Sequence, residues 1–475
     1  MSSSSNQSKT PQETPTGVSN LFEQNTTKIT KPISEFAQNE MANYLAKELK
    51  NTLTIDPITE HWLQKTDSNI WRVIRKKHAR LVIEQRLEKV KPTYSESYIS
   101  SIIRLLDSRL CAPSWTNERH LLPLKNGVFN LQTNKLEAYN DYTFNWQLPF
   151  KYNPISICPK IKKWLEVATQ NDEGIKHFLI CWMQAVLTGR HDLQKYLEII
   201  GHGGTGKGTY TRIISALVGT ENIIITDLKS LEKNRFETAN LYGKRLVIIT
   251  DAKYWGGEVS VLKAITGGDS IRYERKGVQG GESFLFEGLV LIASNENIKT
   301  SDYTSGLSRR RITVPFEHII SEEEKAENPD FEHQLHSELS GLFNVLISLK
   351  DDGVTQAIRQ PVDSIKKAKF EAELNTNSLL AWLHEKVEKC DFGRESRIGD
   401  KSFDIKNGMY ANYVKYCEDN GNESVALKRF SELIITNCVS RGIPTKKYNQ
   451  AGTNRAYITN LRLKHDKNSE KGLFC

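Results

Sequence analysis

A glycine-rich segment lies between two apolar patterns of different period. Before it, the run from Tyr196 to Ile200 has the length and composition of a buried strand; after it, apolar residues recur at helical spacing from Ile213 to Val218. In such a strand, loop and helix, backbone amides surround phosphate groups at the helix N-terminus, and the lysine ammonium reaches the β and γ phosphates. The predicted phosphate-binding residues are Gly201, His202, Gly203, Gly204, Thr205, Gly206, Lys207, Gly208 and Thr209.

The residue after the lysine departs from the usual phosphate-loop pattern. Gly208 stands where Ser or Thr would bind Mg²⁺ through its hydroxyl group, and Thr209 follows one position later. We therefore expect Thr209 to bind the Mg²⁺ that accompanies ATP, directly or through water. The same Gly-Lys-Gly-Thr run resembles adenylate kinases, so a small-molecule kinase is an alternative at this point.

Two later apolar runs each end in a polar residue that can serve the same site. Asp251 follows the run Leu246–Thr250, and its carboxylate would hold the water shell of Mg²⁺. Asn295 follows the run Leu289–Ser294, and its amide would orient the attacking water or contact the γ phosphate; the alternative is an ordinary turn residue. We predict Asp251 as a metal and catalytic residue, and Asn295 as a catalytic residue.

A basic run extends from Ser308 to Phe316. A guanidinium group there would neutralise charge on a phosphoryl group in the site of a neighbouring subunit, and Arg310 and Arg311 are the candidates. The other interpretation is a basic surface turn. An arginine that acts between subunits requires a head-to-tail interface, which closes as a ring or continues as a filament.

The order of these motifs resembles superfamily 3 helicases within the AAA+ ATPases, especially the phage and plasmid primase-helicase family that includes the poxvirus-type helicases. The pattern Leu-Lys-x-x-Thr-Gly-Gly-Asp at Leu262 is the most specific, because nothing in adenylate kinases resembles it. Residues 125–133 and 147–150 resemble the helical leader domain of that family, and the whole resemblance covers about residues 95–370. The five blocks that match in order are residues 201–209, Asp251, residues 262–271, Asn295 and Arg310-Arg311.

The resemblance implies roles for individual residues. Lys207 and Thr209 would bind nucleotide and Mg²⁺, Asp251 would be the Walker B acid, and Asn295 would be the first sensor. Arg311, or Arg310, would be the arginine finger of a hexameric ring. No general base is assigned, because no residue next to Asp251 supplies the second carboxylate that often accompanies such an acid.

Two basic regions are candidates for DNA binding. Residues 271–286 alternate, break at glycines and alternate again, which predicts a β-hairpin. The resemblance places such a hairpin in the central channel, where Arg275 and Lys276 would grip phosphates; otherwise it is a solvated turn. Residues 427–467 hold nine basic and two acidic side chains in a pattern that looks like a winged helix. Its candidate DNA contacts are Lys428, Arg429, Lys446 and Lys447. The alternative is a partner-binding or merely solvated module.

The 475 residues allow several domains, and alternating short strands and helices after Tyr196 predict an α/β fold with a parallel sheet. Seven scattered cysteines indicate a reducing interior, and no apolar run reaches membrane-spanning length, so we expect a cytoplasmic protein. The expected parts are a disordered tail at 1–38, a helical N-terminal leader domain at 39–160, a helical linker at 161–190, an AAA+ ATPase core at 191–325, a helical segment at 326–390 and a winged-helix domain at 391–475.

The chain has a net charge of +8, which suits a partner that carries phosphate groups. The resemblance implies an ATP-dependent DNA helicase of a phage, plasmid or other mobile element. It would form a ring, translocate on single-stranded DNA and unwind forked DNA during replication. A separate primase or polymerase would then be a partner. The main alternative is an ATP-dependent DNA-binding initiator or loader that does not unwind DNA.

Overall fold

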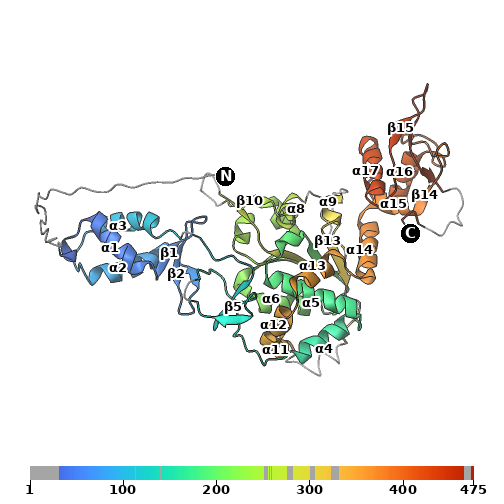
Figure 1. The fold of residues 1–475 in the computed structure, drawn as a ribbon. Coiled ribbons are helices and arrows are strands. Elements are labelled where there is room, and N and C mark those ends of the chain that lie inside the picture. Colours follow the sequence, from blue (N-terminus) through green and yellow to red (C-terminus); the bar gives the residue numbers. More distant parts are fainter. Residues whose placement is uncertain are drawn as a thin grey trace, which may run out of the picture. The chain divides into compact units, whose positions relative to one another are not determined.

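The computed structural model describes residues 32–112, 114–139, 142–250, 255, 257, 259–274, 282–299, 305–321, 331–464 and 472–474. The chain divides into two compact units (Figure 1). One unit comprises Met1–Asn51 and Lys76–Leu110, and the other comprises Thr52–Arg75 and Cys111–Cys475.

The smaller unit is built from helices. Its last helix begins after Ser95, whose hydroxyl oxygen accepts a hydrogen bond from the Tyr98 amide at 3.2 Å. Apolar residues from Ile99 to Leu106 recur at helical spacing, and this helix buries them on one face. The elements of this unit are η1 (Ile33–Glu35), α1 (Gln38–Leu49), α2 (Lys76–Glu88) and α3 (Glu96–Arg109).

Two three-stranded antiparallel sheets occupy much of the region 39–160, which the sequence assigns to a mainly helical leader domain. Ile70 and Trp71 fall in a pattern of helical spacing, but Trp71 pairs with Lys65 in a β-hairpin. The chain turns at Asn69, which has a positive φ of 63°. An apolar stretch this short fits the period of a helix as well as that of a strand, so the turn at Asn69 decides that the chain forms a hairpin. The strands are β1 (Leu53–Ile55), β2 (Trp62–Lys65), β3 (Trp71–Val73), β4 (Leu121–Leu124), β5 (Gly127–Asn130) and β6 (Lys135–Glu137).

The two helices that the sequence assigns to a linker at 161–190 belong to the central core instead. They are α4 (Pro159–Ala168) and α5 (Glu173–Leu187). Trp164 and Trp182 share one apolar cluster with side chains of the central sheet. Most side chains of α5 are buried, and such a helix cannot serve as an exposed link between domains.

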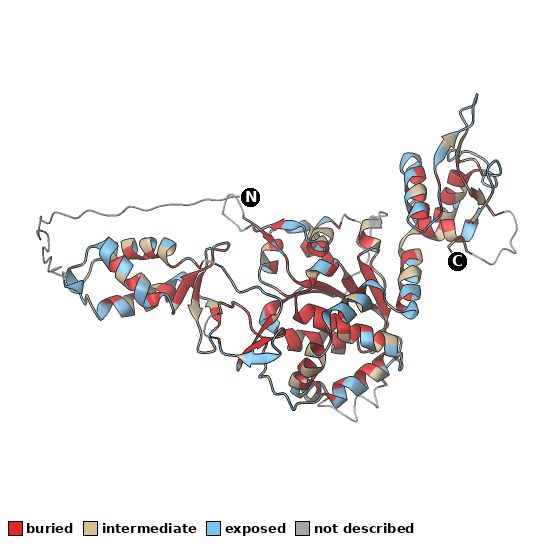
Figure 2. Ribbon diagram, viewed as in Figure 1, coloured by how far each residue is buried: buried red, intermediate tan, exposed pale blue. Residues whose placement is uncertain are grey.

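A five-stranded parallel sheet lies at the centre of the larger unit, in the order β13-β7-β12-β9-β8 (Figure 1). Three of these strands, β7, β9 and β12, coincide with the predicted apolar runs, so the mixed α/β fold with a parallel sheet is confirmed. Figure 2 shows buried residues along the central sheet: β7, β9, β12 and β13 are buried along most of their length, whereas the edge strand β8 buries fully only its first residue. β12 pairs with both β7 and β9. Because β7 and β12 are adjacent parallel strands, their carboxyl ends lie side by side. The strands are β7 (Tyr196–Ile200), β8 (Ile223–Thr226), β9 (Leu246–Thr250), β12 (Leu289–Ser294) and β13 (Arg311–Pro315).

Helices cover this sheet and continue after it. A short antiparallel pair, β10 (Ser270–Arg272) and β11 (Ser283–Leu285), forms the described part of the predicted hairpin. The remaining elements are η2 (His191–Leu193), α6 (Lys207–Val218), η3 (Thr220–Asn222), α7 (Leu228–Lys233), η4 (Thr238–Leu241), α8 (Ser260–Gly267), α9 (Ser305–Ser308), α11 (Phe331–Ser337), α12 (Leu339–Ile347), α13 (Asp351–Arg359) and α14 (Asp363–Thr376).

A separate apolar cluster marks the C-terminal domain, and this domain begins near Ser378 rather than at 391. Trp382 is fully buried in the cluster. The polar stretch 393–401 is part of the domain and not a link, because Ser396 accepts a hydrogen bond from the Leu463 amide at 2.9 Å. The elements are α15 (Ser378–Lys386), β14 (Val387–Lys389), α16 (Met409–Asp419), α17 (Leu427–Val439), β15 (Lys447–Asn449), β16 (Ala456–Ile458) and β17 (Leu461–Leu463).

In the part of the chain that the structure describes, no helix combines the length and apolar character needed to cross a bilayer.

Candidate functional site

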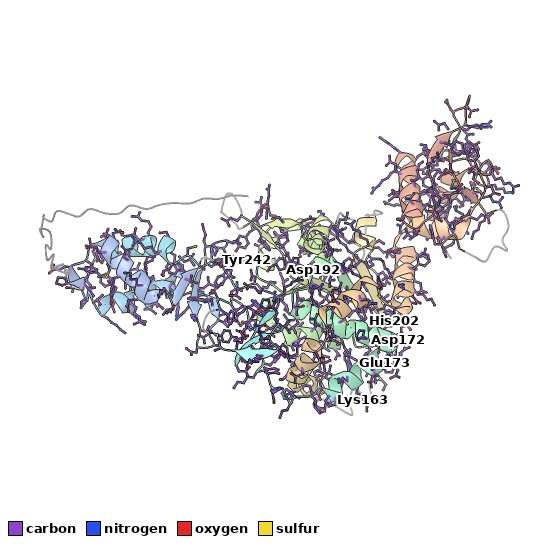
Figure 3. All side chains as sticks on the ribbon, viewed as in Figure 1. Lys163, Asp172, Glu173, Asp192, His202 and Tyr242 are labelled. Carbon is purple, nitrogen blue, oxygen red and sulfur yellow. The ribbon has the colours of Figure 1, made fainter. Side chains whose placement is uncertain are left out.

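The glycine-rich loop connects β7 to α6, as the strand, loop and helix pattern predicts. Gly204 and Gly206 have positive φ angles of 83° and 91°, a backbone conformation that glycine adopts without Cβ strain. A Cβ atom on Gly201 would lie 2.1 Å from the carbonyl oxygen of Phe316. The loop ends at the N-terminus of α6, where unpaired backbone amides favour an anion. His202 is exposed on this loop (Figure 3).

The ammonium group of Lys207 lies at the centre of the loop. It donates hydrogen bonds to the carbonyl oxygens of Gly201 at 2.6 Å and His202 at 2.7 Å. It also donates to the side-chain oxygen of Asn295 at 3.1 Å. This contact follows from the strand order, because Asn295 comes directly after β12 and Lys207 directly after the loop of the adjacent strand. Two predicted site residues that are far apart in sequence are thus in direct contact.

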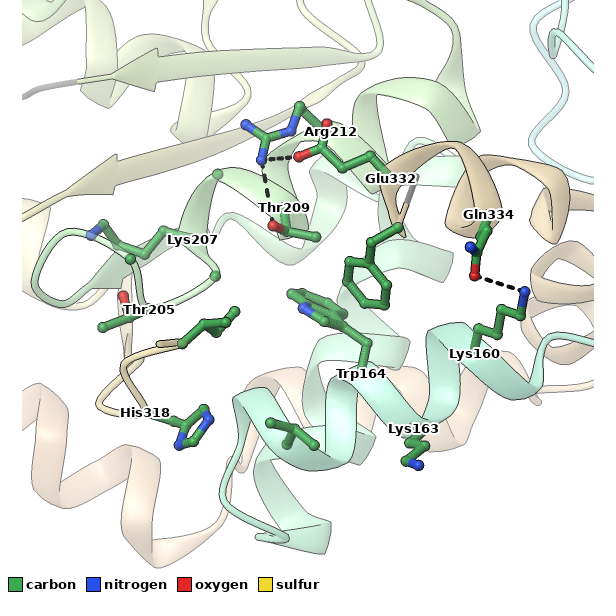
Figure 4. A pocket seen from close by; sticks show the side chains of 16 residues that line it. Lys160, Lys163, Trp164, Thr205, Lys207, Thr209, Arg212, His318, Glu332 and Gln334 are labelled. Atoms are coloured by element: carbon green, nitrogen blue, oxygen red, sulfur yellow. Dashed lines mark hydrogen bonds and ion pairs between the residues drawn. The ribbon is translucent and has the colours of Figure 1, made fainter. Parts of the chain in front are cut away.

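The hydroxyl group of Thr209, the predicted metal ligand, is turned toward Arg212 (Figure 4). It accepts a hydrogen bond from the guanidinium group at 3.4 Å, and Arg212 also forms an ion pair with Glu332. A Cβ atom on Gly208 would lie 2.9 Å from the same guanidinium, so this glycine leaves space for Arg212 along the helix. Among the described residues, no group of three or more His, Cys, Asp and Glu side chains could hold a metal ion alone. Among the described residues, Thr209 would offer Mg²⁺ a single oxygen, so the ion would need further oxygen ligands such as those of phosphate.

A cavity of about 740 Å³ opens beside the loop, within the size range of nucleotide pockets (Figure 4). Its walls come from α4, α6, the segment after β13 and α11. Trp164, Phe331 and Ile320 supply apolar side chains to its lining. The lining residues are Lys160, Lys163, Trp164, Val167, Gly204, Thr205, Gly206, Lys207, Gly208, Thr209, Arg212, His318, Ile320, Phe331, Glu332 and Gln334.

A buried carboxylate holds the turn that follows Asn295. Glu198 of β7 is fully buried, and its two oxygens accept hydrogen bonds from the Ile298 amide at 2.9 Å and the Asn297 side chain at 3.0 Å. The same carboxylate lies 3.6 Å from the guanidinium of Arg311, which donates to the Ile298 carbonyl oxygen at 2.9 Å. This network therefore fixes the position of the turn that carries Asn295.

The structure does not favour the predicted role of Arg311 in a neighbouring subunit, because its side chain is buried. Arg311 begins β13, is 4% exposed, and donates to the hydroxyl of Tyr196 at 3.0 Å. Burial opposes its charge, but Tyr196 and Glu198 raise the pKa of Arg311 above the ordinary value. A guanidinium group held in this way inside the sheet cannot reach another subunit.

Of the other two arginines in this run, Arg310 is 8% exposed and Arg309 is exposed. Arg310 donates to the carbonyl oxygen of Gly306 at 2.9 Å, and burial, followed by the charge of Arg309, lowers its pKa. Arg310 also covers the end of α8, because a Cβ atom on Gly267 would lie 2.6 Å from its guanidinium. Of these three arginines, Arg309 alone has an exposed side chain, and its position in the basic run carried no signal that distinguished it from its neighbours.

Several predicted residues lie elsewhere. Asp251, Arg275 and Lys276 are outside the described residues. The predicted DNA-binding side chains of the C-terminal domain are all exposed, at the start of α17 and at β15; they are Lys428, Arg429, Lys446 and Lys447. None of these lies among the lining residues of the cavity.

Two family descriptions match different parts of the chain. "D5 N terminal like" matches residues 42–170, and "Family of unknown function (DUF5906)" matches residues 199–311. The first match supports the resemblance to phage-type primase-helicases in the leader region. The second covers the phosphate loop, Asn295 and the start of β13.

Relatives of known sequence match over short stretches. The "Uncharacterized mitochondrial protein ymf20" of Marchantia polymorpha is 28% identical over 119 residues, which is 24% of this chain and 71% of the relative. The "Uncharacterized mitochondrial protein ymf21" of the same organism is 23% identical over 126 residues, which is 24% of this chain and 70% of the relative.

Among solved structures, the apo C-terminal region of NrS-1 has a similar fold. One structure of it matches with a TM-score of 0.52 and 16% sequence identity, over 88% of this chain and 99% of that chain. This likeness supports the mixed α/β architecture.

Proposed function

We propose that this chain is an ATP-dependent DNA helicase that acts in the replication of a phage, plasmid or other mobile element. The observation that carries the proposal is the contact between Lys207 and Asn295 across two adjacent strands. An ATPase needs a cation and an orienting amide at the same phosphate, and this contact supplies both. The insertion of β12 between β7 and β9 supports an AAA+ core.

In the proposed reaction, the loop amides and Lys207 bind the phosphates of ATP. Asn295 orients the attacking water, and the network of Glu198 and Arg311 keeps Asn295 in place. Thr209 and Asp251 would hold Mg²⁺, which neutralises phosphate charge when it is bound. The base of the nucleotide would occupy the cavity beside Trp164 and Phe331, where stacking on aromatic rings stabilises a flat ring system.

The proposed ring places the exposed Arg309 near the phosphates bound by a neighbouring subunit. A guanidinium group supplied in this way stabilises charge in the transition state. A head-to-tail interface of this kind can close into a ring, and the family resemblance implies a hexamer. The hairpin of β10 and β11 and a C-terminal winged helix would contact DNA, and a separate primase or polymerase would supply the remaining replication steps.

The test compares hydrolysis by the wild-type chain and by Lys207→Ala. We expect the substitution to abolish DNA-stimulated release of inorganic phosphate, while the surface substitution Lys229→Ala leaves it unchanged. Full activity of Lys207→Ala would refute the site. Phosphate transfer to a nucleoside monophosphate, without net hydrolysis, would instead identify a nucleotide kinase.

Unwinding of a forked duplex separates a helicase from an initiator or loader. We expect strand separation that requires hydrolysable ATP; hydrolysis without strand separation would favour the initiator or loader. Mixing tests the ring, because Arg309→Ala and Lys207→Ala chains should be inactive separately and partly active together. A mixture without activity would refute the role of Arg309 between subunits.

A further inference from the structure

A large aromatic side chain on the C-terminal domain is almost fully exposed. Phe392 follows β14 and is 74% exposed. Leaving a phenyl ring in water is unfavourable, and an exposed ring with organised surroundings is a feature of binding surfaces. The ring of Phe392 is not isolated, because its centroid lies 5.6 Å from that of Tyr448 with an interplanar angle of 35°.

Tyr448 in turn stacks on Tyr457. The two tyrosines lie directly opposite each other on β15 and β16, with ring centroids 5.5 Å apart and an interplanar angle of 22°. Phe392, Tyr448 and Tyr457 therefore form a row of three rings, which we call the aromatic ladder. Phe392 is its exposed outer member.

Hydrogen bonds hold the ladder in position. One oxygen of Glu395 accepts from the Gly393 amide at 2.7 Å and from the Tyr448 hydroxyl at 3.3 Å. Gly393 has a positive φ of 89°, which lets the chain turn sharply after Phe392. Because the turn and the neighbouring ring share one acceptor, the position of Phe392 is set before any ligand binds.

The ladder carries positive charge on its own face. The antiparallel hydrogen bonding continues past both strands, because the Thr459 amide donates to the Lys446 carbonyl oxygen at 3.0 Å and the Gln450 amide donates to that of Arg455 at 2.9 Å. Side chains alternate along such a paired chain, so Lys446 is expected on the face of Tyr448 and Arg455 on the face of Tyr457. Both basic side chains are exposed. Residues 442–464 contain five basic side chains and no acidic one. The face thus combines stacking surfaces with cations, the combination that binds unpaired nucleic acid strands.

We propose that the aromatic ladder binds an unpaired DNA strand, with one base stacked on the exposed face of Phe392 and the phosphates beside Lys446 and Arg455. In a duplex the bases are stacked on each other, so the ring of Phe392 has no free base to contact. The inference rests on the proposed function for the choice of DNA as the nucleic acid.

The experiment measures binding of the full chain, without nucleotide, to fluorescent oligothymidine and to a strand of equal length that carries central abasic sites. The wild-type chain should prefer the strand with bases. Phe392→Ala should weaken its binding about ten-fold, the size of one base stacking on an aromatic ring, and should abolish the preference over the abasic strand. Phe392→Trp should keep both the affinity for the strand with bases and the preference over the abasic strand.

Two results would overturn the proposal. One is a Phe392→Ala chain that still prefers bases over abasic sites; the other is an equal loss of affinity for a blunt duplex. The matched control is Ile405→Ala, because Ile405 is 47% exposed in the same domain, and it should bind as the wild type does. The logarithm of the binding constant falls linearly with the logarithm of the salt concentration. Replacing Lys446 and Arg455 with Gln should make this slope shallower by about 1.4 for both strands.

The same titration with Lys207→Ala separates this inference from the proposed function. This substitution lies in the phosphate loop and should leave strand binding unchanged. If Lys207→Ala retains ATP hydrolysis but Phe392→Ala loses the preference for bases, the proposed function is wrong and the aromatic ladder stands. If forked DNA is unwound but Phe392→Ala keeps the preference, the inference alone is wrong.

Discussion

Lys207 and Asn295 form the contact at the candidate site, but a second pair determines where Asn295 lies. Glu198 accepts hydrogen bonds from the turn after Asn295, and Arg311 donates to a carbonyl oxygen of that turn. Both side chains are inside the protein, where a carboxylate and a guanidinium are stable only as partners. The pair is therefore a positioning device that makes no contact with phosphate itself.

Glu198→Gln should separate catalysis from binding. The amide keeps the volume of the carboxylate but loses its charge and two of its acceptor sites, so the turn of Asn295 shifts while the loop and Lys207 remain. We expect kcat for ATP hydrolysis to fall about a hundred-fold, the size of a misplacement near 1 Å, while the Kd for ATP changes less than about three-fold. Steady-state kinetics and equilibrium titration measure the two quantities.

The control is Glu388→Gln, which breaks a half-exposed ion pair with Arg462 on the C-terminal domain. It should change neither kcat nor, by more than about 1 kcal/mol, the free energy of unfolding. A proportional change of kcat and Kd in Glu198→Gln would contradict the positioning role.

Lys195, which comes directly before β7, gives a pH-dependent prediction. Burial, followed by the like charges of Lys369, Arg359, Arg309 and Arg310, lowers the pKa of Lys195 to about 8. Between this value and about 10.4, the unfolded chain binds more protons than the folded one, so this residue makes stability rise with pH. In urea unfolding, the free energy of unfolding of Lys195→Met should therefore exceed that of the wild type most clearly below pH 8. The difference between the two should shrink toward pH 10. If the free energies of unfolding of the two chains changed in parallel with pH, the lowered pKa of Lys195 would be ruled out.

The α11 helix supplies a side chain to the cavity beside the glycine-rich loop, and no local sequence pattern identifies this side chain. Phe331 is half-buried and lines the cavity together with Trp164 of α4. If it packs against the base, Phe331→Ala should weaken ATP binding about ten-fold and leave binding of inorganic tripolyphosphate unchanged. Calorimetric titration of both ligands tests this, with Phe236→Ala as a control outside the cavity. Equal losses for the two ligands would show that Phe331 acts through the phosphate loop.

The extent of sequence prediction at this site has a physical explanation. The loop at 201–209 and its flanking strand and helix are local, and neighbouring residues in the chain determine them. Trp164 and Phe331 meet only after the sheet has formed, so their spacing carries no signal. The basic run 308–316 does not reveal that Arg311 begins a buried strand, because its partner residue, Tyr196 of β7, lies more than a hundred residues earlier in the chain.

The fold of the whole chain combines separate apolar cores. The cluster of the central sheet extends from the leader region to α14, whereas the C-terminal domain has a cluster of its own. Arg441 of that domain forms an ion pair with Glu373 of α14 at 2.7 Å. One ion pair contributes little compared with an apolar core, so the stability of the C-terminal domain should depend mainly on its own residues.

A fragment of residues 378–475 should therefore fold alone. Its length of about one hundred residues is typical of independent domains. Trp382 is its single tryptophan and is fully buried, so the fluorescence of this residue reports unfolding directly. We expect one cooperative urea transition and retention of the Phe392-dependent preference for strands with bases. A gradual change in fluorescence would show that the domain needs the central sheet. A complementary chain ending at residue 377 should still bind ATP, because every lining residue of the cavity precedes that point.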